Sequence, residues 1–326
     1  VIHGFLHVFN SQSKKLASSI EPHVGKGSFD HFPYLKVNAL ETLCGKCYLF
    51  SVFLVAFKFW LQSDIIYRLV GLKKKEQELV ETLHAMIDTV SVKMKFEKSC
   101  KKENFKKYKP FLDLLLDLSK NGALTDKEIR EEMDTIVAAG FETTSSQLTY
   151  TLLLLGSYPE VQEKVFQELL EVLGPDRDVE KDDVSKLVYT NAVLMESLRL
   201  YPPVPVIFRY VDKDVKLSNY TMRAGSNCVL FPVAAMLDPT WGPDSDKFRP
   251  ERWLDGDLKN KKEFAAFGLG KRSCIGRTYA MITMKVTLAH FLRKYRVKGD
   301  VSKMKLKVKF VMRPESGHEI TIERRT

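Results

Sequence analysis

The chain has 326 residues, of which 44% are hydrophobic and 28% charged, and this composition is that of a folded protein with a sizeable core. Its formal net charge of +10 favours acidic partners, but no basic stripe interleaved with aromatic residues is present, which argues against nucleic acid binding. Five cysteines, an odd number, argue against a disulfide scaffold and favour a reducing compartment.

The first part of the chain has weak signals. We expect one helix before Pro22, a glycine-rich turn, and a second helix from about Phe32. Cys44 and Cys47 have the Cys-x-x-Cys spacing of a metal or redox site, but no second pair of ligands stands at zinc-finger spacing, so the signal is weak.

Residues 47–110 contain an apolar stretch, a periodic segment and a lysine-rich segment. The apolar stretch, Cys47 to Phe57, is too short to span a membrane and predicts a buried helix. Helical periodicity follows from Lys73 to Met94. The lysines between Lys93 and Lys109 indicate a solvated linker, with a partner or membrane patch as the alternative.

A long helix is predicted to begin at the capping box Thr125-Asp-Lys-Glu128 and to run to about Ser157. Its interior contains Ala139-Gly-Phe-Glu-Thr-Thr144, in which a glycine and two threonines are poor helix formers. Such a local violation of propensity indicates either a functional site or a packing contact between helices.

Two more helices are predicted at Pro159–Leu173, closed by Gly174, and at Val188–Leu200. The second helix contains Glu196 and Arg199, whose i, i+3 spacing places both on one face. An exposed ion pair of small energetic value is the alternative interpretation of that spacing.

The chain then becomes rich in short strands and irregular segments. Strands are expected at 206–211, 215–217, 220–222 and 227–231, and an irregular stretch leads to Pro250-Glu-Arg-Trp253. At the end, alternation through Leu306, a turn at Pro314–Gly317 and a return through Ile322 predict a hairpin. Helices dominate the order, so the predicted fold class is mainly α with a minor β-sheet region.

One segment stands out chemically: Phe267-Gly-Leu-Gly-Lys-Arg-Ser-Cys-Ile-Gly276, followed by an apolar, helix-like run from Arg277. A cysteine thiolate is a strong axial ligand for haem iron. Gly270 and Gly276 let the backbone turn tightly, and the helix start stabilises a thiolate at Cys274. Arg272 is suited to bind a carboxylate of the cofactor. A buried structural cysteine in a turn is the alternative, which the full spacing disfavours.

This loop resembles the cysteine-ligand loop of the cytochrome P450 family, the haem-thiolate monooxygenases. Three other motifs stand in the family's order: Ala139–Thr144 resembles its oxygen-activating helix, Glu196-x-x-Arg199 its Glu-x-x-Arg pair, and Pro250–Trp253 its Pro-Glu-Arg-Phe loop. Residues 1–45 and 64–80 resemble more loosely an insect and vertebrate family-4 branch. The resemblance implies a P450-type fold.

The resemblance also implies a role for each residue. Cys274 would ligate the iron, Phe267 would pack beside it, and Arg272 and Arg209 would contact haem propionates. Gly140 would let the distal helix approach the oxygen site, with Ala139 and Thr144 lining the pocket. Glu142 and Thr143 would form the acid–alcohol pair that delivers protons. Glu196, Arg199 and Arg252 would form a buried structural triad. Ala139 stands where some relatives carry a glutamate bonded to haem, so we expect non-covalent haem b.

The family further implies insertion of one oxygen atom of O2 into a small apolar substrate such as a fatty acid, terpenoid or xenobiotic. Electrons would come from an NADPH-dependent cytochrome P450 reductase, with cytochrome b5 as a second donor, and Lys271 beside the loop fits an acidic donor. Full-length members lie on the cytoplasmic face of the endoplasmic reticulum membrane.

The domain expected here is a single catalytic domain over 1–326 that lacks the family's N-terminal third, including its anchor. Middle helices would occupy 1–109, and a haem-binding helical core with a C-terminal hairpin 110–326. Two alternatives stay open at this point: a non-catalytic remnant that retains no haem, and a reductase-independent haem enzyme that rearranges peroxides.

Overall fold

The computed structural model describes residues 2–44, 111–254, 264–308 and 311–325. The expectations for Cys47, for the apolar stretch to Phe57, for the periodic segment 73–94 and for the lysine-rich linker all fall outside the described residues.

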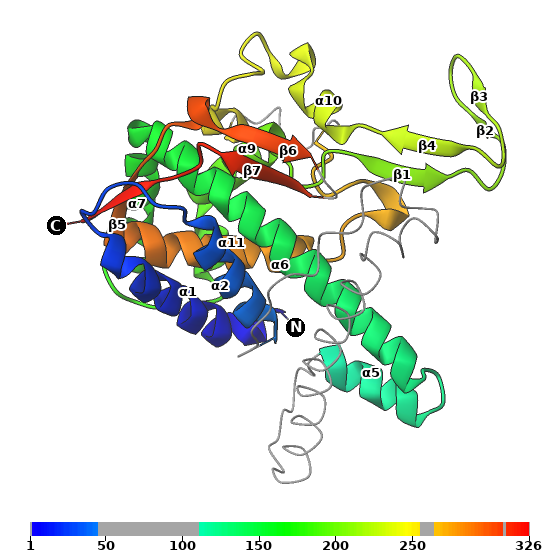
Figure 1. Cartoon of the computed structure of the whole chain (residues 1–326), viewed down its shortest axis with the longest axis horizontal. Helices are drawn as coiled ribbons and strands as arrows, with labels where there is room; N and C mark the ends of the chain where they lie inside the picture. The colour runs from blue at the N-terminus through cyan, green and yellow to red at the C-terminus, as the bar shows by residue number, and fades with distance from the viewer. Residues whose placement is uncertain (1, 45–110, 255–263, 309–310, 326) are drawn as a thin grey trace, which may run out of the picture.

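Helices make up most of the described chain (Figure 1). The α-helices are α1 (Leu6–Ile20), α2 (Phe32–Cys44), α5 (Phe111–Lys120), α6 (Asp126–Ser157), α7 (Pro159–Leu173), α8 (Asp183–Lys186), α9 (Val188–Leu200), α10 (Pro232–Leu237) and α11 (Arg277–Lys294). Short 3-10 helices are η1 (Ile2–Phe5), η2 (Glu21–His23), η4 (Pro239–Trp241), η5 (Pro250–Trp253), η7 (Gly270–Arg272) and η8 (Val301–Lys303).

Within the described ranges, the strands pair in four small antiparallel sheets of two strands each. The pairs are β1 (Ile207–Tyr210) with β4 (Asn227–Leu230), β2 (Val215–Lys216) with β3 (Thr221–Met222), β5 (Tyr295–Lys298) with β8 (Thr321–Arg324), and β6 (Lys305–Val308) with β7 (Met312–Ser316). The predicted fold class, mainly α with a minor β region, is therefore confirmed.

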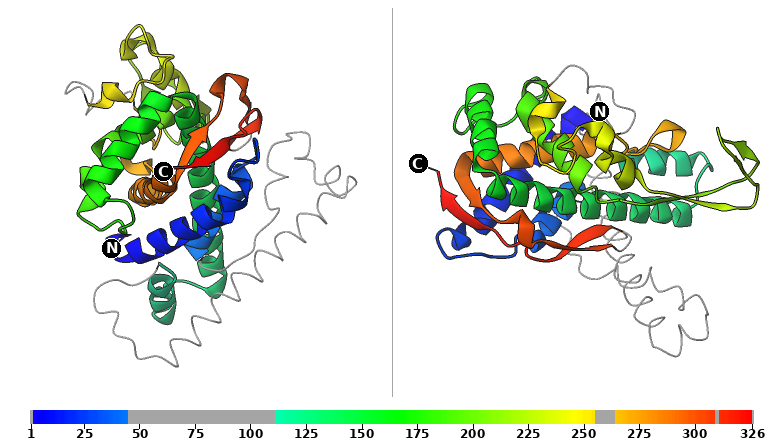
Figure 2. Two further views of the ribbon diagram at one scale, coloured as in Figure 1. Left: turned by 90° about the vertical axis from the view of Figure 1, so that its left-hand side faces the viewer. Right: turned by 90° about the horizontal axis from the view of Figure 1, so that it is seen from above.

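The core forms around α6 and α11. Figure 2 shows α6 running through the molecule, and it contacts α2, α7, α9 and α11. The second half of α6 buries a continuous set of leucines: Leu148, Leu152, Leu153, Leu154 and Leu155. A helix that is buried on every side needs neighbours on every side, and these helices supply them. α1 packs in turn against both α11 and α2.

Both ends of α6 follow from local chemistry, as predicted. Thr125 Oγ1 accepts a hydrogen bond from the Glu128 amide, and the Glu128 carboxylate accepts one from the Thr125 amide over 2.8 Å. These hydrogen bonds from Thr125 hold the pKa of Glu128 below its usual range. The helix ends at Ser157, because Pro159 then occupies the first turn of α7. The predicted bounds of α7 and α9 are also confirmed.

The predicted C-terminal hairpin forms, but its turn and its second strand differ from the prediction. β6 pairs with β7, so the chain reverses between Val308 and Met312 rather than at Pro314–Gly317. The strand that carries Ile322 pairs with β5, not with β6. The alternation of apolar residues that ends at Ile322 would allow this strand to pair with either β5 or β6. Burial selects β5, because Ile322 is 1% exposed in the main core whereas β6 lies at the surface.

Candidate functional site

The glycine-rich segment before α11 forms a tight turn that leaves its cysteine at the surface. η7 precedes Cys274, and the Cys274 amide donates a hydrogen bond to the carbonyl of Phe267 over 2.7 Å. Gly270 has a φ of 72°, which glycine adopts at little cost. Cys274 is exposed and forms no disulfide, so its thiol is accessible to a ligand.

The two other glycines of this loop differ from the prediction. Gly276 has a φ of −85°, which any residue adopts, so the turn does not require it. It is the N-cap of α11, which places Cys274 just before the first turn of a helix. Gly268, with a φ of 68°, is the second glycine that the turn uses, and sequence reasoning missed it.

Basic and aromatic groups surround the cysteine loop. The Arg277 guanidinium lies 5.6 Å from the centroid of the half-buried Phe267 ring. Arg272 is exposed and forms no ion pair with the described residues. Arg209 lies on a separate element, β1, where it is exposed and its Nη1 donates to the carbonyl of Phe208. Both predicted propionate arginines are therefore accessible to a carboxylate.

The middle of α6 divides the predicted distal residues between two faces. Ala139 is exposed, and Thr143, one turn later, is partly exposed and donates its Oγ1 hydrogen to the Ala139 carbonyl over 2.7 Å. Gly140 has a different neighbour: a Cβ there would lie 2.7 Å from Cδ1 of Leu43 on α2. Gly140 therefore permits close packing of α2 on α6. Thr144 is buried.

Glu142 faces away from Thr143, into the protein. Its carboxylate is fully buried and forms ion pairs with Arg313 Nε on β7 over 2.5 Å and Lys36 Nζ on α2 over 3.3 Å. Neighbouring residues on a helix do not face each other, and the structure does not bring this carboxylate and the Thr143 hydroxyl together. Arg313 and Lys36 were not singled out from the sequence, since both come from segments distant in the chain.

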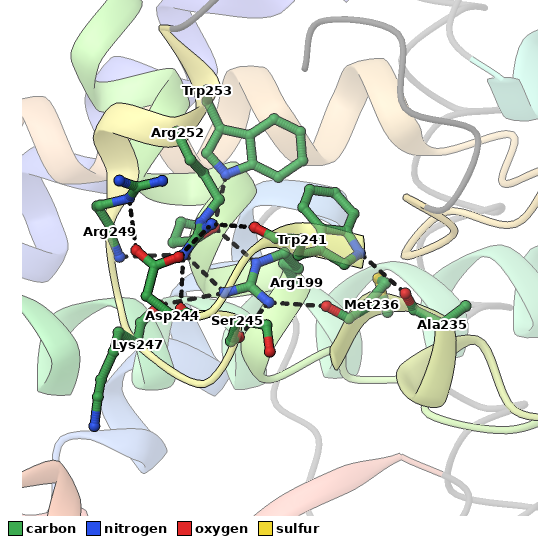
Figure 3. Close-up of polar contacts among 11 residues, drawn as sticks. Arg199, Ala235, Met236, Trp241, Asp244, Ser245, Lys247, Arg249, Arg252 and Trp253 are labelled. Carbon is green, nitrogen blue, oxygen red and sulfur yellow. Dashed lines mark hydrogen bonds and ion pairs between the residues drawn. The ribbon is translucent and has the colours of Figure 1, made fainter. Parts of the chain in front are cut away.

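Glu196, Arg199 and Arg252 are brought together in a fully buried cluster (Figure 3). Arg199 donates to both carboxylate oxygens of Glu196, from Nε over 2.9 Å and from Nη2 over 2.8 Å. Arg252 Nε donates to Glu196 Oε1 over 2.8 Å. The i, i+3 spacing on α9 thus forms a buried ion pair rather than the exposed pair that was its alternative.

The remaining guanidinium hydrogens are satisfied by the chain that wraps around the cluster. Backbone carbonyls accept them at Met236, Trp241, Asp244, Ser245 and Lys247. Such satisfaction of hydrogen bonds is what permits a buried charge network to persist. Sequence reasoning could not find these carbonyls, because a backbone acceptor has no residue signature.

Asp244 is a second carboxylate beside the triad. It contacts Arg252 Nη2 at 3.3 Å and Arg249 Nε at 2.9 Å. Burial raises the pKa of Asp244, but the charges of Arg252 and Arg249 outweigh burial and hold that pKa below its usual range. The network therefore contains two carboxylates against three guanidiniums.

Glu251 anchors η5 on its outer side. Its Oε1 accepts from Lys164 Nζ of α7 over 2.6 Å and from the Tyr189 hydroxyl of α9 over 2.7 Å. Burial raises the pKa of Glu251, but these hydrogen bonds outweigh it and the pKa is lowered. The Pro-Glu-Arg-Trp segment is thus fixed from both sides, by Glu251 outward and Arg252 inward.

The residues around Cys274 fit a haem group. Leu269 and Ile275, which flank the cysteine, are 62% and 86% exposed, an unusual exposure for large apolar side chains. A thiol for the iron, accessible guanidiniums for the propionates and an apolar loop surface for the ring make up a suitable donor set. Within the described residues, no group of three metal-ligating side chains offers a competing metal site.

Comparisons with known proteins point the same way. A family model described as Cytochrome P450 matches residues 48–322. "Cytochrome P450 4c3" of Drosophila melanogaster is 30% identical over 366 aligned residues, covering 99% of this chain and 68% of that protein. "Cytochrome P450 4V2" of Mus musculus is 30% identical over 363 residues, covering 100% of this chain and 69% of that protein. "Probable cytochrome P450 4d20" of Drosophila melanogaster is 36% identical over 219 residues, 66% of this chain.

No helix within the described residues is both long and apolar enough to cross a membrane.

Proposed function

This chain belongs to the cytochrome P450 family of haem-dependent monooxygenases, and on that basis we propose that it inserts one oxygen atom of O2 into a small apolar substrate. The observation that carries the proposal is the cysteine loop: an exposed thiol, fixed by its own amide, just before the first turn of α11. When bound, the haem supplies the activation of O2. The residues of the chain hold it, shield it and deliver protons beside it.

In this proposal Cys274 binds the iron as a thiolate. Its amide already donates to the Phe267 carbonyl, which fixes the direction of the Cα–Cβ bond before any ligand arrives. The N-terminus of α11 stabilises the negative charge on Sγ, because its first amides have no partner within the helix. Phe267 packs beside the ligand.

Arg272 and Arg209 bind the two propionates. Each guanidinium is exposed to water. Binding of a propionate therefore replaces its hydration by a charge-assisted hydrogen bond to the carboxylate. Ala139 presents only a methyl group on the distal helix and offers no carboxylate for an ester bond to the cofactor. The haem is therefore held non-covalently, by the thiolate, these two arginines and apolar contacts.

Thr143 and Glu142 move protons on the distal side. The Thr143 side chain is partly exposed, and its hydroxyl donates to the Ala139 carbonyl of its own helix, so it can rotate toward a distal ligand. The Glu142 carboxylate is buried against Arg313 and Lys36, so its side chain must leave these partners before it can reach the distal side. Proton delivery is thus coupled to movement of the Glu142 side chain. Gly140 supports this arrangement by bringing α2, and with it Lys36, close to α6.

The buried triad of Glu196, Arg199 and Arg252 is structural. It ties α9 to η5 and, through Arg199, to the segment just before η5. Both arginine side chains are fully buried, so neither guanidinium contacts solvent.

Electrons come from an NADPH-dependent reductase, with cytochrome b5 as a second donor. The exposed Lys271 and Arg277 lie at or next to the ligand loop, and an acidic donor would dock there, close to the thiolate. We further propose, by analogy with the family, that the protein acts at the cytoplasmic face of the endoplasmic reticulum membrane. The substrate class stays as broad as fatty acids, terpenoids and foreign apolar compounds.

The test is haem uptake by the expressed chain, followed by reduction and binding of carbon monoxide. We expect the red-shifted Soret band of a thiolate-ligated ferrous–CO complex, and we expect Cys274→Ala to abolish it. A chain that folds but takes up no haem would be the non-catalytic remnant and would refute the proposal.

Turnover measurements distinguish the monooxygenase from the remaining alternative, the peroxide-rearranging enzyme. A monooxygenase uses NADPH, reductase and O2 to form a hydroxylated product. If the loaded protein rearranged organic hydroperoxides but never consumed NADPH with reductase present, it would be a peroxide-rearranging enzyme instead.

A further inference from the structure

We propose that Trp253 is a positioning residue for the cysteine loop, connecting the buried triad to the segment that carries Cys274. The inference rests on the proposed function for its meaning, but its structural claim concerns the chain alone. Trp253 ends η5 and is 9% exposed. Its indole N–H is a donor that a phenylalanine of similar bulk would lack.

The indole N–H completes the hydrogen bonding of the Glu196 carboxylate. Trp253 Nε1 donates to Glu196 Oε2 over 2.9 Å (Figure 3). The same oxygen accepts from Arg199 Nε, while Oε1 accepts from Arg199, from Arg252 and from the Arg249 amide. Among the described residues, Trp253 is thus the one uncharged side chain that binds this carboxylate. This hydrogen bond to the fully buried Glu196 carboxylate fixes the orientation of the Trp253 indole.

The ring of Trp253 transmits that orientation to the cysteine loop. Its edge-to-face partner is Phe264, with ring centroids 5.0 Å apart and an interplanar angle of 78°. Phe264 precedes Phe267 by three residues, and the Phe267 carbonyl accepts the Cys274 amide over 2.7 Å. A continuous path therefore runs from the Glu196 carboxylate through two aromatic rings and one short backbone segment to the ligand amide.

A second tryptophan in the same cluster provides a matched control. Trp241 packs against Trp253 with centroids 5.4 Å apart, and it too is buried. Its indole, however, donates to the Ala235 carbonyl rather than to Glu196. Trp241→Phe and Trp253→Phe thus remove the same chemical group from the same cluster, and only the second removes it from the triad.

The first experiment measures hydrogen exchange at the Cys274 amide in the full chain without haem. We expect exchange in Trp253→Phe to be about tenfold faster than in the natural sequence, because a hydrogen bond to a charged acceptor usually contributes at least that factor. Trp253→Leu, which also removes the ring that contacts Phe264, should exchange faster still. Trp241→Phe should leave the Cys274 amide unchanged. Equal exchange in Trp253→Phe and Trp241→Phe would overturn the inference.

The second experiment compares loss of the thiolate Soret band with global unfolding during heating. In the haem-loaded natural sequence and in Trp241→Phe the two transitions should coincide. In Trp253→Phe the Soret band should disappear at a lower temperature than the helical circular dichroism. If the two transitions also coincided in Trp253→Phe, Trp253 would contribute to global stability alone, and the positioning role would be refuted. If no variant took up haem, the proposed function would fail, and the exchange experiment would still decide the positioning claim.

Discussion

Glu196→Gln is the substitution expected to affect stability most, because it removes the one carboxylate that both buried arginines share. Glu196, Arg199 and Arg252 are all 0% exposed, so neither guanidinium can be rehydrated without opening the fold. Removing one partner of a buried ion pair costs about 3–5 kcal/mol. The free energy of unfolding of a typical domain is about 5–15 kcal/mol, so this loss would be a large fraction of the total. The substitution keeps the side-chain shape, so lost packing does not contribute.

Urea unfolding followed by circular dichroism measures this loss as a lower midpoint at unchanged slope. The matched control is Glu323→Gln, whose carboxylate lies 2.6 Å from Lys298 with both side chains about half exposed. Exposed pairs contribute about 0.2–1 kcal/mol, so the control should barely move the midpoint. Combining Glu196→Gln with Arg252→Met should cost less than the two single losses added together. Equal midpoint shifts in Glu196→Gln and Glu323→Gln would refute the account of the triad.

Three further predictions concern stability elsewhere in the core. Gly156→Ala should lower the free energy of unfolding by about 1–3 kcal/mol in urea titrations, because the added Cβ would lie 2.7 Å from the Gly299 backbone nitrogen; an unchanged midpoint would contradict this packing. Burial lowers the pKa of His31 to about 4, so the unfolded chain binds more protons between pH 6.5 and 4, and stability should fall as the pH is lowered through that window. His31→Gln should reduce that slope, and an identical pH profile would refute the assignment. Burial likewise lowers the pKa of Lys285 to about 8, and its Nζ donates to the Val184 carbonyl; stability should rise from pH 8 to 10.5, and Lys285→Met should remove that rise and increase stability at pH 7. A Lys285→Met protein less stable at pH 7 would show that the ammonium is favourably bound.

The helical framework was predictable because its signals are local. The capping box at Thr125, the proline at 159 and the glycine at 174 each fix a helix end through neighbouring atoms alone. Strand partners were not predictable in the same way. The alternation that ends at Ile322 is satisfied by β5 as well as by β6, and only the position of the core distinguishes the two.

The candidate site shows the same division. The spacing of Glu196 and Arg199 lies within one helix, and their pairing followed from the sequence. The partners of Glu142 did not, because Arg313 and Lys36 come from strands and helices far away in the chain. Gly140 stands out in the sequence as a poor helix former, but the sequence does not show which neighbour the missing side chain allows to approach. In the structure that neighbour is Leu43 of α2.

The central claim is that Cys274 ligates haem iron, and the ferrous–CO spectrum tests it most directly. Cys228, the other free cysteine among the described residues, supplies the control. We predict that the natural sequence and Cys228→Ser give the thiolate-type Soret band after haem uptake, and that Cys274→Ser does not. A thiolate-type band that survived in Cys274→Ser, or no haem uptake by the folded natural sequence, would contradict the account.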